Sequence, residues 1–226
     1  SALLKLALPT IISQLINVIY NIVDTIYIGQ TGDAYKTAAV TLAFTLFMMT
    51  VPIANMFGIG GGSLIARLMG KGEKNKAKNV SAFSFYGAIA AAVLYSVIIG
   101  VFQTPILHAF GASEMTLAFA KQYVLYVLIL GNVPVILSMT TAHLLRNAGL
   151  SRQASIGLSM GGILNIILDP IFMFRILPPG MEVAGAAIAT LISNIAACIY
   201  LVVRLKMAQK DSPLSMSPRA AETIGR

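Results

Sequence analysis

The sequence has few charged residues and no tryptophan. Asp, Glu, Lys and Arg make up 11% of its 226 residues, whereas apolar types make up 57%. Soluble domains carry about 25% charged residues, and a soluble chain of this length could not bury so much apolar surface. The scarcity of charge therefore excludes an ordinary soluble domain and indicates an integral protein of the lipid bilayer.

Cysteine is also nearly absent. The single Cys198 lies in an apolar run, so the chain can form neither a disulfide framework nor a metal site built from cysteines. We interpret Cys198 as a small buried hydrophobic residue. His108 and His143 have no partners at metal-ligand spacing, and we expect no resident cofactor. Since Ser1 is not an initiator Met and the first apolar run is too long for a signal peptide, we expect a trimmed N-terminus.

Nucleotide-binding and nucleic-acid-binding motifs are missing as well. The glycines of "FGIGGGSLIARLMGKG" do not form a phosphate-binding loop, because no strand precedes them and no Ser or Thr follows Gly70-Lys71. They are more typical of close packing between helices. No basic stripe is interleaved with aromatic residues, so we expect no nucleic-acid partner.

Long apolar runs dominate what the sequence does contain. A transmembrane helix needs about 20 apolar residues, because each residue rises about 1.5 Å through about 30 Å of hydrocarbon. Runs of this length cover residues 6–28, 38–60, 80–102, 117–144, 154–174 and 183–203. The sequence therefore predicts an all-α integral membrane protein, a six-transmembrane-helix bundle.

Positive charge is distributed unevenly between the loops. Of the sixteen Lys and Arg residues, three would lie on one side of the membrane: Lys36, Lys121 and Arg175. The other thirteen would lie on the opposite side: Lys5, Arg67, Lys71, Lys74, Lys76, Lys78, Arg146, Arg152, Arg204, Lys206, Lys210, Arg219 and Arg226. Because cytoplasmic loops are enriched in Lys and Arg, we expect both termini of this chain to be cytoplasmic.

The end of the chain differs in composition from the rest. Residues 1–207 hold all six predicted spans, whereas residues 208–226 are polar and contain two prolines. We interpret 208–226 as a cytoplasmic linker that leads towards further chain.

Two acids, Asp24 and Asp169, lie inside predicted spans. Both spans run outward, and the acids precede the ends of their spans by four and five residues. We therefore expect both carboxyl groups in the outer half of the bilayer, sharing one cavity if their helices are neighbours. No Lys or Arg lies mid-span to neutralise them. Ionisable residues in such positions are usually functional.

Polar side chains accompany the acids at helical spacing. Those that recur three or four residues apart are Asn17, Asn21, Asn165, Thr190 and Asn194, and Tyr20 flanks the first group. Two carboxyl groups in a low-dielectric cavity repel each other and lose hydration. They lower their energy by holding a proton or by binding a hard cation such as Na⁺. We expect Asp24, Asp169, Asn165 and Thr190 to form this site, the first three being metal ligands if Na⁺ is bound.

Two prolines interrupt the spans that carry the acids. Pro170 follows Asp169 and cannot donate a backbone hydrogen bond to the carbonyl of Ile166. Pro9 lies near the start of the first span. Both are candidate points at which a helix bends during a change of shape.

Several sequence blocks resemble those of one transporter family. They are "IYNIVDTIYIGQTGD", "GGGSLIARLMGKGE", "LRNAGLSRQASIGLSMGGILNIILDPIFMF" and "VAGAAIATLISN". In this order they resemble the multidrug and toxic compound extrusion (MATE) family over nearly the whole chain. The resemblance implies two six-helix lobes related by a pseudo-twofold axis. This chain would be the N-terminal lobe, and the second six-helix lobe would be its partner.

The resemblance also implies an antiporter rather than an enzyme. Members export organic cations or other amphipathic compounds in exchange for H⁺ or Na⁺. By its motifs, Asp24 corresponds to the acid of the family's first span, Asn165 and Asp169 to the pair in its fifth, and Thr190 to a threonine in its sixth. The subgroup is similar to bacterial multidrug exporters, which implies a multi-pass protein of the plasma (inner) membrane.

Three other functions are compatible with a membrane bundle that carries two acids. A flippase for lipid-linked precursors would favour cationic residues in its cavity, and the predicted spans carry none in mid-span, since Lys121 lies near the outer end of its span. An intramembrane aspartyl protease would use Asp24 and Asp169 as its dyad, but "IILDP" lacks the glycines of a GxGD motif. A structural membrane subunit would use the acids only to hold helices together.

Overall fold

The computed structural model describes residues 2–210 and 212–218, with side chains from residue 7 onward. Its helices, in chain order, are α1 (Ala2–Gly29), α2 (Ala34–Met48), α3 (Thr50–Gly70), α4 (Lys74–Val101), α5 (Gln103–Ala109), α6 (Glu114–Val124), the π-helix η1 (Leu125–Leu130), α7 (Asn132–Asn147), α8 (Ser151–Ile171), the π-helix η2 (Phe172–Ile176) and α9 (Glu182–Ala208). The predicted all-α fold is confirmed. Arg219, Arg226 and the side chain of Lys5, which entered the charge count, lie outside the described part.

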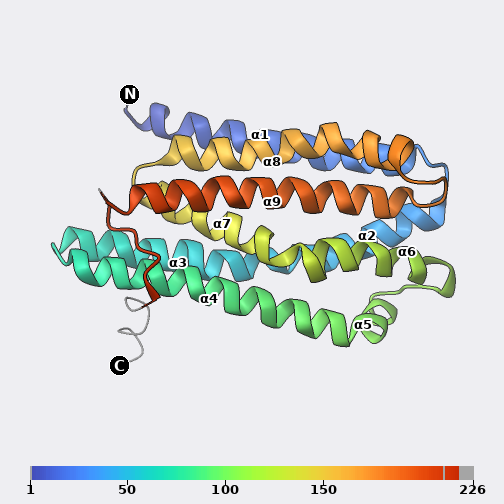
Figure 1. The fold of residues 1–226 in the computed structure, drawn as a ribbon, viewed down its shortest axis with the longest axis horizontal. Coiled ribbons are helices and arrows are strands. Elements are labelled where there is room, and N and C mark those ends of the chain that lie inside the picture. The colour runs from blue at the N-terminus through green and yellow to red at the C-terminus, as the bar shows by residue number, and fades with distance from the viewer. Residues whose placement is uncertain (1, 211, 219–226) are drawn as a thin grey trace.

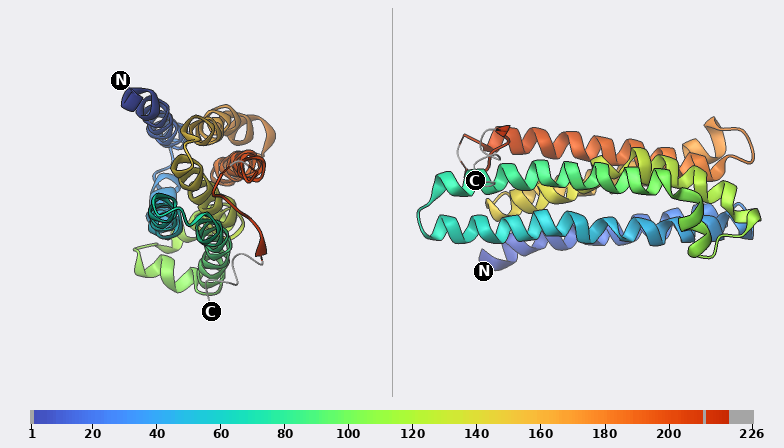
Figure 2. Two further views of the ribbon diagram at one scale, coloured as in Figure 1. Left: turned by 90° about the vertical axis from the view of Figure 1, so that its left-hand side faces the viewer. Right: turned by 90° about the horizontal axis from the view of Figure 1, so that it is seen from below.

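The long helices run side by side along one axis of the molecule (Figure 1). α7 lies at the centre and contacts α3, α4, α8 and α9, whereas α1 packs mainly against α8. Figure 2 shows the same bundle from its end and from below. We call the end that holds the α3–α4 and α7–α8 connections the basic end, because Lys71, Lys74 and Arg152 lie there. Its assignment to the cytoplasm stays a prediction.

The helix lengths agree with a membrane protein. Among the described residues, five helical segments are long and apolar enough to cross a membrane, and a sixth results if α6 to α7 is counted as one bent span. The outside of the bundle is apolar as well. On α1, eight large aliphatic side chains are between 48% and 56% exposed, which suits contact with lipid or another apolar surface.

The fourth predicted span, 117–144, is not one continuous helix. Segment Glu114–Leu130 meets Asn132–Asn147 at an angle of 49°. A Cβ at Gly131 would lie 2.7 Å from the Val127 carbonyl oxygen, and Pro134 cannot donate a hydrogen bond to the Leu130 carbonyl. A glycine and a proline three residues apart therefore bend a segment that is uniformly apolar in sequence.

The second predicted span, 38–60, is longer in the structure. α2 and α3 together cover Ala34–Gly70, so the helix continues through the glycines that were expected to mark its end. A Cβ at Gly61 would collide with Ser84 of α4, and one at Gly62 would collide with Asn147 of α7. These glycines therefore permit close helix contacts, as the sequence predicted.

Residues 212–218 fold back onto α4 after α9 ends. Leu214 is buried against the core at the basic end. The Ser81 hydroxyl accepts a hydrogen bond from the Ser215 amide at 3.1 Å. The Tyr86 hydroxyl donates to the Met216 carbonyl at 2.9 Å. The first part of the predicted linker is thus attached to the bundle, and its function as a linker stays a prediction.

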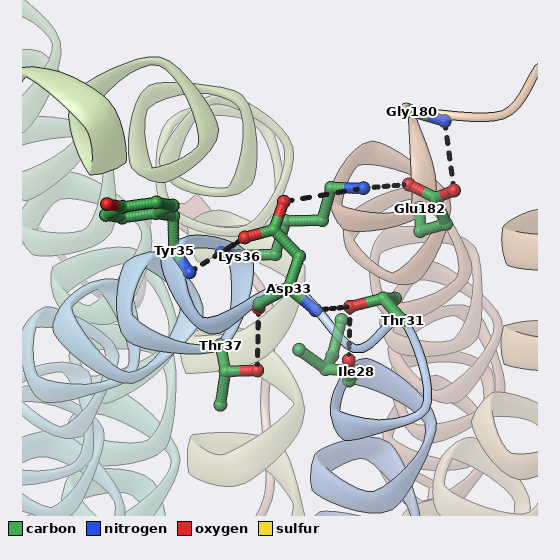
Figure 3. Close-up of polar contacts among 8 residues, drawn as sticks. All are labelled: Ile28, Thr31, Asp33, Tyr35, Lys36, Thr37, Gly180 and Glu182. Carbon is green, nitrogen blue, oxygen red and sulfur yellow. Dashed lines mark hydrogen bonds and ion pairs between the residues drawn. The ribbon is translucent and has the colours of Figure 1, made fainter.

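An ion pair joins α2 and α9 at the opposite end (Figure 3). Lys36 Nζ lies 2.8 Å from Glu182 Oε2 and 4.0 Å from Asp33 Oδ2. Asp33 also caps α2, since its Oδ1 accepts the Tyr35 amide at 2.8 Å. Glu182 Oε1 accepts the Gly180 amide at 2.9 Å. The side chains of Lys36 and Glu182 are only 12% and 15% exposed, so water screens this pair less than a surface pair.

We expect Lys36→Met to destabilise the protein by about 1–3 kcal/mol, because it leaves Glu182 half-desolvated without its counter-charge. Thermal unfolding in detergent measures this effect. The matched control is Lys76→Met, which breaks the exposed Lys76–Glu73 pair at the basic end and should change stability little, because water screens that pair. Equal losses of stability in both variants would contradict the idea that burial makes the Lys36–Glu182 pair contribute more than an exposed pair.

Candidate functional site

Three of the predicted site residues are joined by hydrogen bonds. Asn165 Nδ2 donates to Asp169 Oδ1 at 3.0 Å, one helical turn away on α8, and to Thr190 Oγ1 of α9 at 3.2 Å. The spacing of four places both α8 residues on the face that packs against α9. Asp169 is fully buried, and Asn165 is 3% exposed. The site thus links two helices through one amide.

Several buried oxygens at this site lack a partner. Asp169 Oδ2, Asn165 Oδ1 and Asp24 Oδ1 make no hydrogen bond within the described residues. Buried polar atoms are nearly always satisfied, so each of these acceptors requires a donor or a cation. All three oxygens belong to the residues that the sequence predicts as metal ligands. The described residues contain no cluster of three His, Cys, Asp or Glu, so a bound cation would need amide and hydroxyl oxygens in addition to the carboxylates.

Asp24 lies on α1 beside this group. The carboxyl groups of Asp24 and Asp169 are close enough for their charges to interact, as expected from their matched depth. Asp24 borders a separate groove between α1 and α2, together with Thr37 and Thr41, rather than the central cavity. Neither Asp24 nor Asp169 is among the residues that line the central cavity, and a cavity shared by the two acids stays a prediction. α1 contacts both α2 and α8. Asp24 can therefore border the groove beside α2 and still interact electrostatically with Asp169 of α8.

A central cavity of about 200 Å³ lies between α1, α2, α3, α7, α8 and α9. Its lining includes six residues that the sequence predicts: Asn17, Tyr20, Asn21, Asn165, Thr190 and Asn194. Gly161 and Gly162 allow α9 and α1 to approach α8 here. A Cβ on Gly161 would lie 3.0 Å from Ala197, and one on Gly162 would lie 3.0 Å from Ile16.

The polar stripe on α1 hydrogen-bonds mainly within its own helix. Asn21 Nδ2 donates to the Asn17 carbonyl at 2.7 Å, and Asn17 Nδ2 lies 3.4 Å from Gln14 Oε1. Ser13 likewise donates to the Thr10 carbonyl at 2.9 Å. These groups therefore do not connect helices in this conformation, and the Asn17 and Asn21 side chains remain on the cavity wall.

Sequence reasoning missed several residues near the acids. Tyr123 of α6 is 4% exposed and close enough to Asp24 and Asp169 for electrostatic interaction. Gln14, Ser138, His143, Arg146 and Ser193 also line the cavity. The sequence assigned His143 no function and placed Arg146 in a loop. The placement of Arg146 is wrong, because α7 continues to Asn147, beyond the predicted end at 144, whereas the expectation for His143 stays a prediction.

The prolines lie within helices. α8 continues through Pro170 and becomes π-helical at Phe172–Ile176, and Pro9 lies inside α1. The wider turn after Pro170 lies directly beside Asp169. Bending at either proline stays a prediction.

Comparison with known proteins places the chain in a family. The family model MatE matches residues 9–171. This chain belongs to the MatE family. It is 35% identical over 202 residues to the multidrug export protein MepA of Staphylococcus aureus (strain NCTC 8325), a match that covers 89% of this chain and 44% of MepA. The chain therefore spans about half the length of the relatives it matches, as expected for one lobe.

Solved structures show the same relationship. A structure described as the outward-facing conformation of a multidrug resistance MATE family transporter matches with a TM-score of 0.86 and 28% identity, over 96% of this chain and 47% of that one. Its inward-facing counterpart matches with a TM-score of 0.81 and 27% identity, over 97% and 49%. The resemblance to the MATE family is confirmed.

We expect Thr190→Val to lower stability by about 1 kcal/mol, because the buried Asn165 amide loses one acceptor while side-chain volume stays nearly constant. Thermal unfolding in detergent measures this loss. Thr45→Val serves as the control, since the exposed Thr45 hydroxyl bonds only to the Thr41 carbonyl of its own helix. If Thr45→Val lowers stability as much as Thr190→Val does, the hydrogen bond between α8 and α9 contributes no more to stability than one within a single helix.

Proposed function

We propose that this chain is the N-terminal lobe of a secondary active exporter that exchanges organic cations or amphipathic compounds for H⁺ or Na⁺. The observation that carries the proposal is the group formed by Asp169, Asn165 and Thr190, whose remaining oxygens lack partners although they are buried. Asp24 lies close enough to add a second carboxylate. Such a group stabilises a bound proton or a small cation.

The mechanism follows from the charge of this site. Substrate enters a cavity shared by this lobe and the second lobe from the cytoplasm. A proton or Na⁺ then arrives from outside and neutralises Asp24 and Asp169. The electrostatic repulsion between the two groups disappears, the helices bend near Pro170 and Pro9, and the substrate leaves outward. A membrane potential of 100 mV supplies about 2.3 kcal/mol for each charge that moves across.

Neither acid has a cation from the described part of the chain to neutralise it. The ion pairs there involve Lys36, Lys76 and His108, all at the ends of the bundle. An exchangeable cation therefore remains the simplest counter-charge. If the two acids had a purely structural role, Asp24→Asn and Asp169→Asn would leave the function of the protein intact.

A lipid-precursor flippase is the second candidate, and one observation favours it. The predicted spans contained no cationic residue in mid-span, yet Arg146 lines the cavity because α7 is longer than expected. A cavity cation suits a pyrophosphate. The absence of cations therefore no longer argues against this function.

The test uses the full-length transporter with both lobes in liposomes. We expect an imposed pH or Na⁺ gradient to drive efflux of a fluorescent organic cation, and Asp24→Asn and Asp169→Asn each to abolish it. The gradient that works identifies the coupling ion. Glu114→Gln is the control, because Glu114 is an exposed acid at the start of α6.

Unchanged efflux in both Asp→Asn variants would assign the acids a structural role and contradict the proposal. If neither gradient drives efflux in the wild type, the flippase becomes the better explanation.

A further inference from the structure

The central cavity contains a cation that the coupling site does not use. Arg146 lies in the last turn of α7 and lines the cavity together with His143, one turn earlier. Its Nε and Nη2 atoms are buried and make no hydrogen bond within the described residues. Guanidinium nitrogens that are buried without acceptors are costly even when the residue is only partly buried, so these two atoms require a partner.

The described part of the lobe supplies no acid to this guanidinium. The salt bridges there do not include Arg146. Glu73, an acid at the basic end, pairs with Lys76. Asp169 lies towards the opposite end of the bundle, where its Oδ1 accepts from Asn165. The partner of Arg146 must therefore come from outside these residues.

The surroundings of Arg146 suit an anion. Gln14, Asn17 and Asn194 line the same cavity and offer amide donors from α1 and α9. The planar fork of an arginine pairs with a carboxylate, sulfonate or phosphate through two parallel hydrogen bonds.

The other part of the cavity wall carries neutral polar groups. Asn165 and Thr190 belong to it and connect it to Asp169. On α7, the lining residues Ser138 and Arg146 are eight residues apart, about 12 Å along the helix axis. The cavity thus has a cation at the basic end and neutral polar groups nearer the middle of the bundle, with Asp169 buried beyond them.

We propose that Arg146 binds the acidic group of the transported molecule, with the amides of Gln14, Asn17 and Asn194 beside it. Amphipathic solutes that carry a carboxylate, sulfonate or phosphate group then bind more tightly than counterparts in which that group is neutral. The inference rests on the proposed export function, since it specifies which substrates that cavity selects.

The experiment compares two dyes of nearly equal shape in the full-length transporter. Rhodamine B carries a carboxylate and a cationic ring system, whereas its ethyl ester lacks the carboxylate. Fluorescence polarisation in nanodiscs gives the affinity for each dye, and gradient-driven efflux from liposomes gives transport.

We expect Arg146→Gln to weaken the binding of rhodamine B at least about tenfold more than that of the ester, because the substitution removes a charge-assisted hydrogen bond. Arg146→Lys should fall between Arg146→Gln and the wild type. Arg152→Gln is the control, since Arg152 lines a separate groove between α1 and α8 and should leave both affinities unchanged. Equal weakening of both dyes, or no weakening of rhodamine B, would overturn the proposal.

A measurement on the wild type covers the case in which Arg146→Gln fails to fold. Benzenesulfonate should displace rhodamine B but not the ester. If only phosphatidylglycerol in the nanodisc displaces it, a lipid headgroup occupies the site and the proposal for a solute is wrong. Failure of the export function is distinguishable, because then neither gradient would drive efflux of the ester by the wild type.

Discussion

The arrangement of the lobe depends on a carboxyl group, that of Asp169, which is fully buried without a cation to balance it. The Asn165 amide satisfies one of its oxygens and ties it to α9 through Thr190, while the second oxygen stays without a partner. Removing a carboxylate from water is costly unless it is paired, so the site is stable only when a proton or cation is present. This requirement can couple occupancy of the site to the packing of α1, α8 and α9.

The interactions around the site divide the lobe into firmly and loosely held parts. At the opposite end, Lys36 and Glu182 fix α2 to α9 (Figure 3). At the basic end, the residues after α9 are fixed to α4 by Ser81 and Tyr86. In contrast, α1 packs mainly against α8 and exposes a long apolar face. A change in charge at Asp24 would therefore act on a helix that packs mainly against one neighbour, α8.

Much of the fold could be predicted from the sequence, because a helix that crosses the hydrocarbon core must be apolar over about 20 residues. Lengths of apolar runs and the spacing of Asn165 and Asp169 follow from helix geometry alone. The contact with Thr190 required only that α8 and α9 be neighbours. The bend at Gly131 and the position of Arg146 could not be predicted, since they depend on packing against other helices. Tyr123 was missed for the same reason, because nothing in its segment distinguishes it from an interfacial tyrosine.

The most direct test of the account is whether an organic cation and the coupling ion exchange at the acids. Tetraphenylphosphonium, which has no proton to lose, is added to the full-length protein in weakly buffered, Na⁺-free detergent solution, and the released protons are measured. The same titration in Na⁺ medium, with a sodium electrode, detects displaced Na⁺. The account predicts release of one of these ions on binding, and its loss in Asp169→Asn. Tetraphenylphosphonium binding without release of either ion would contradict it.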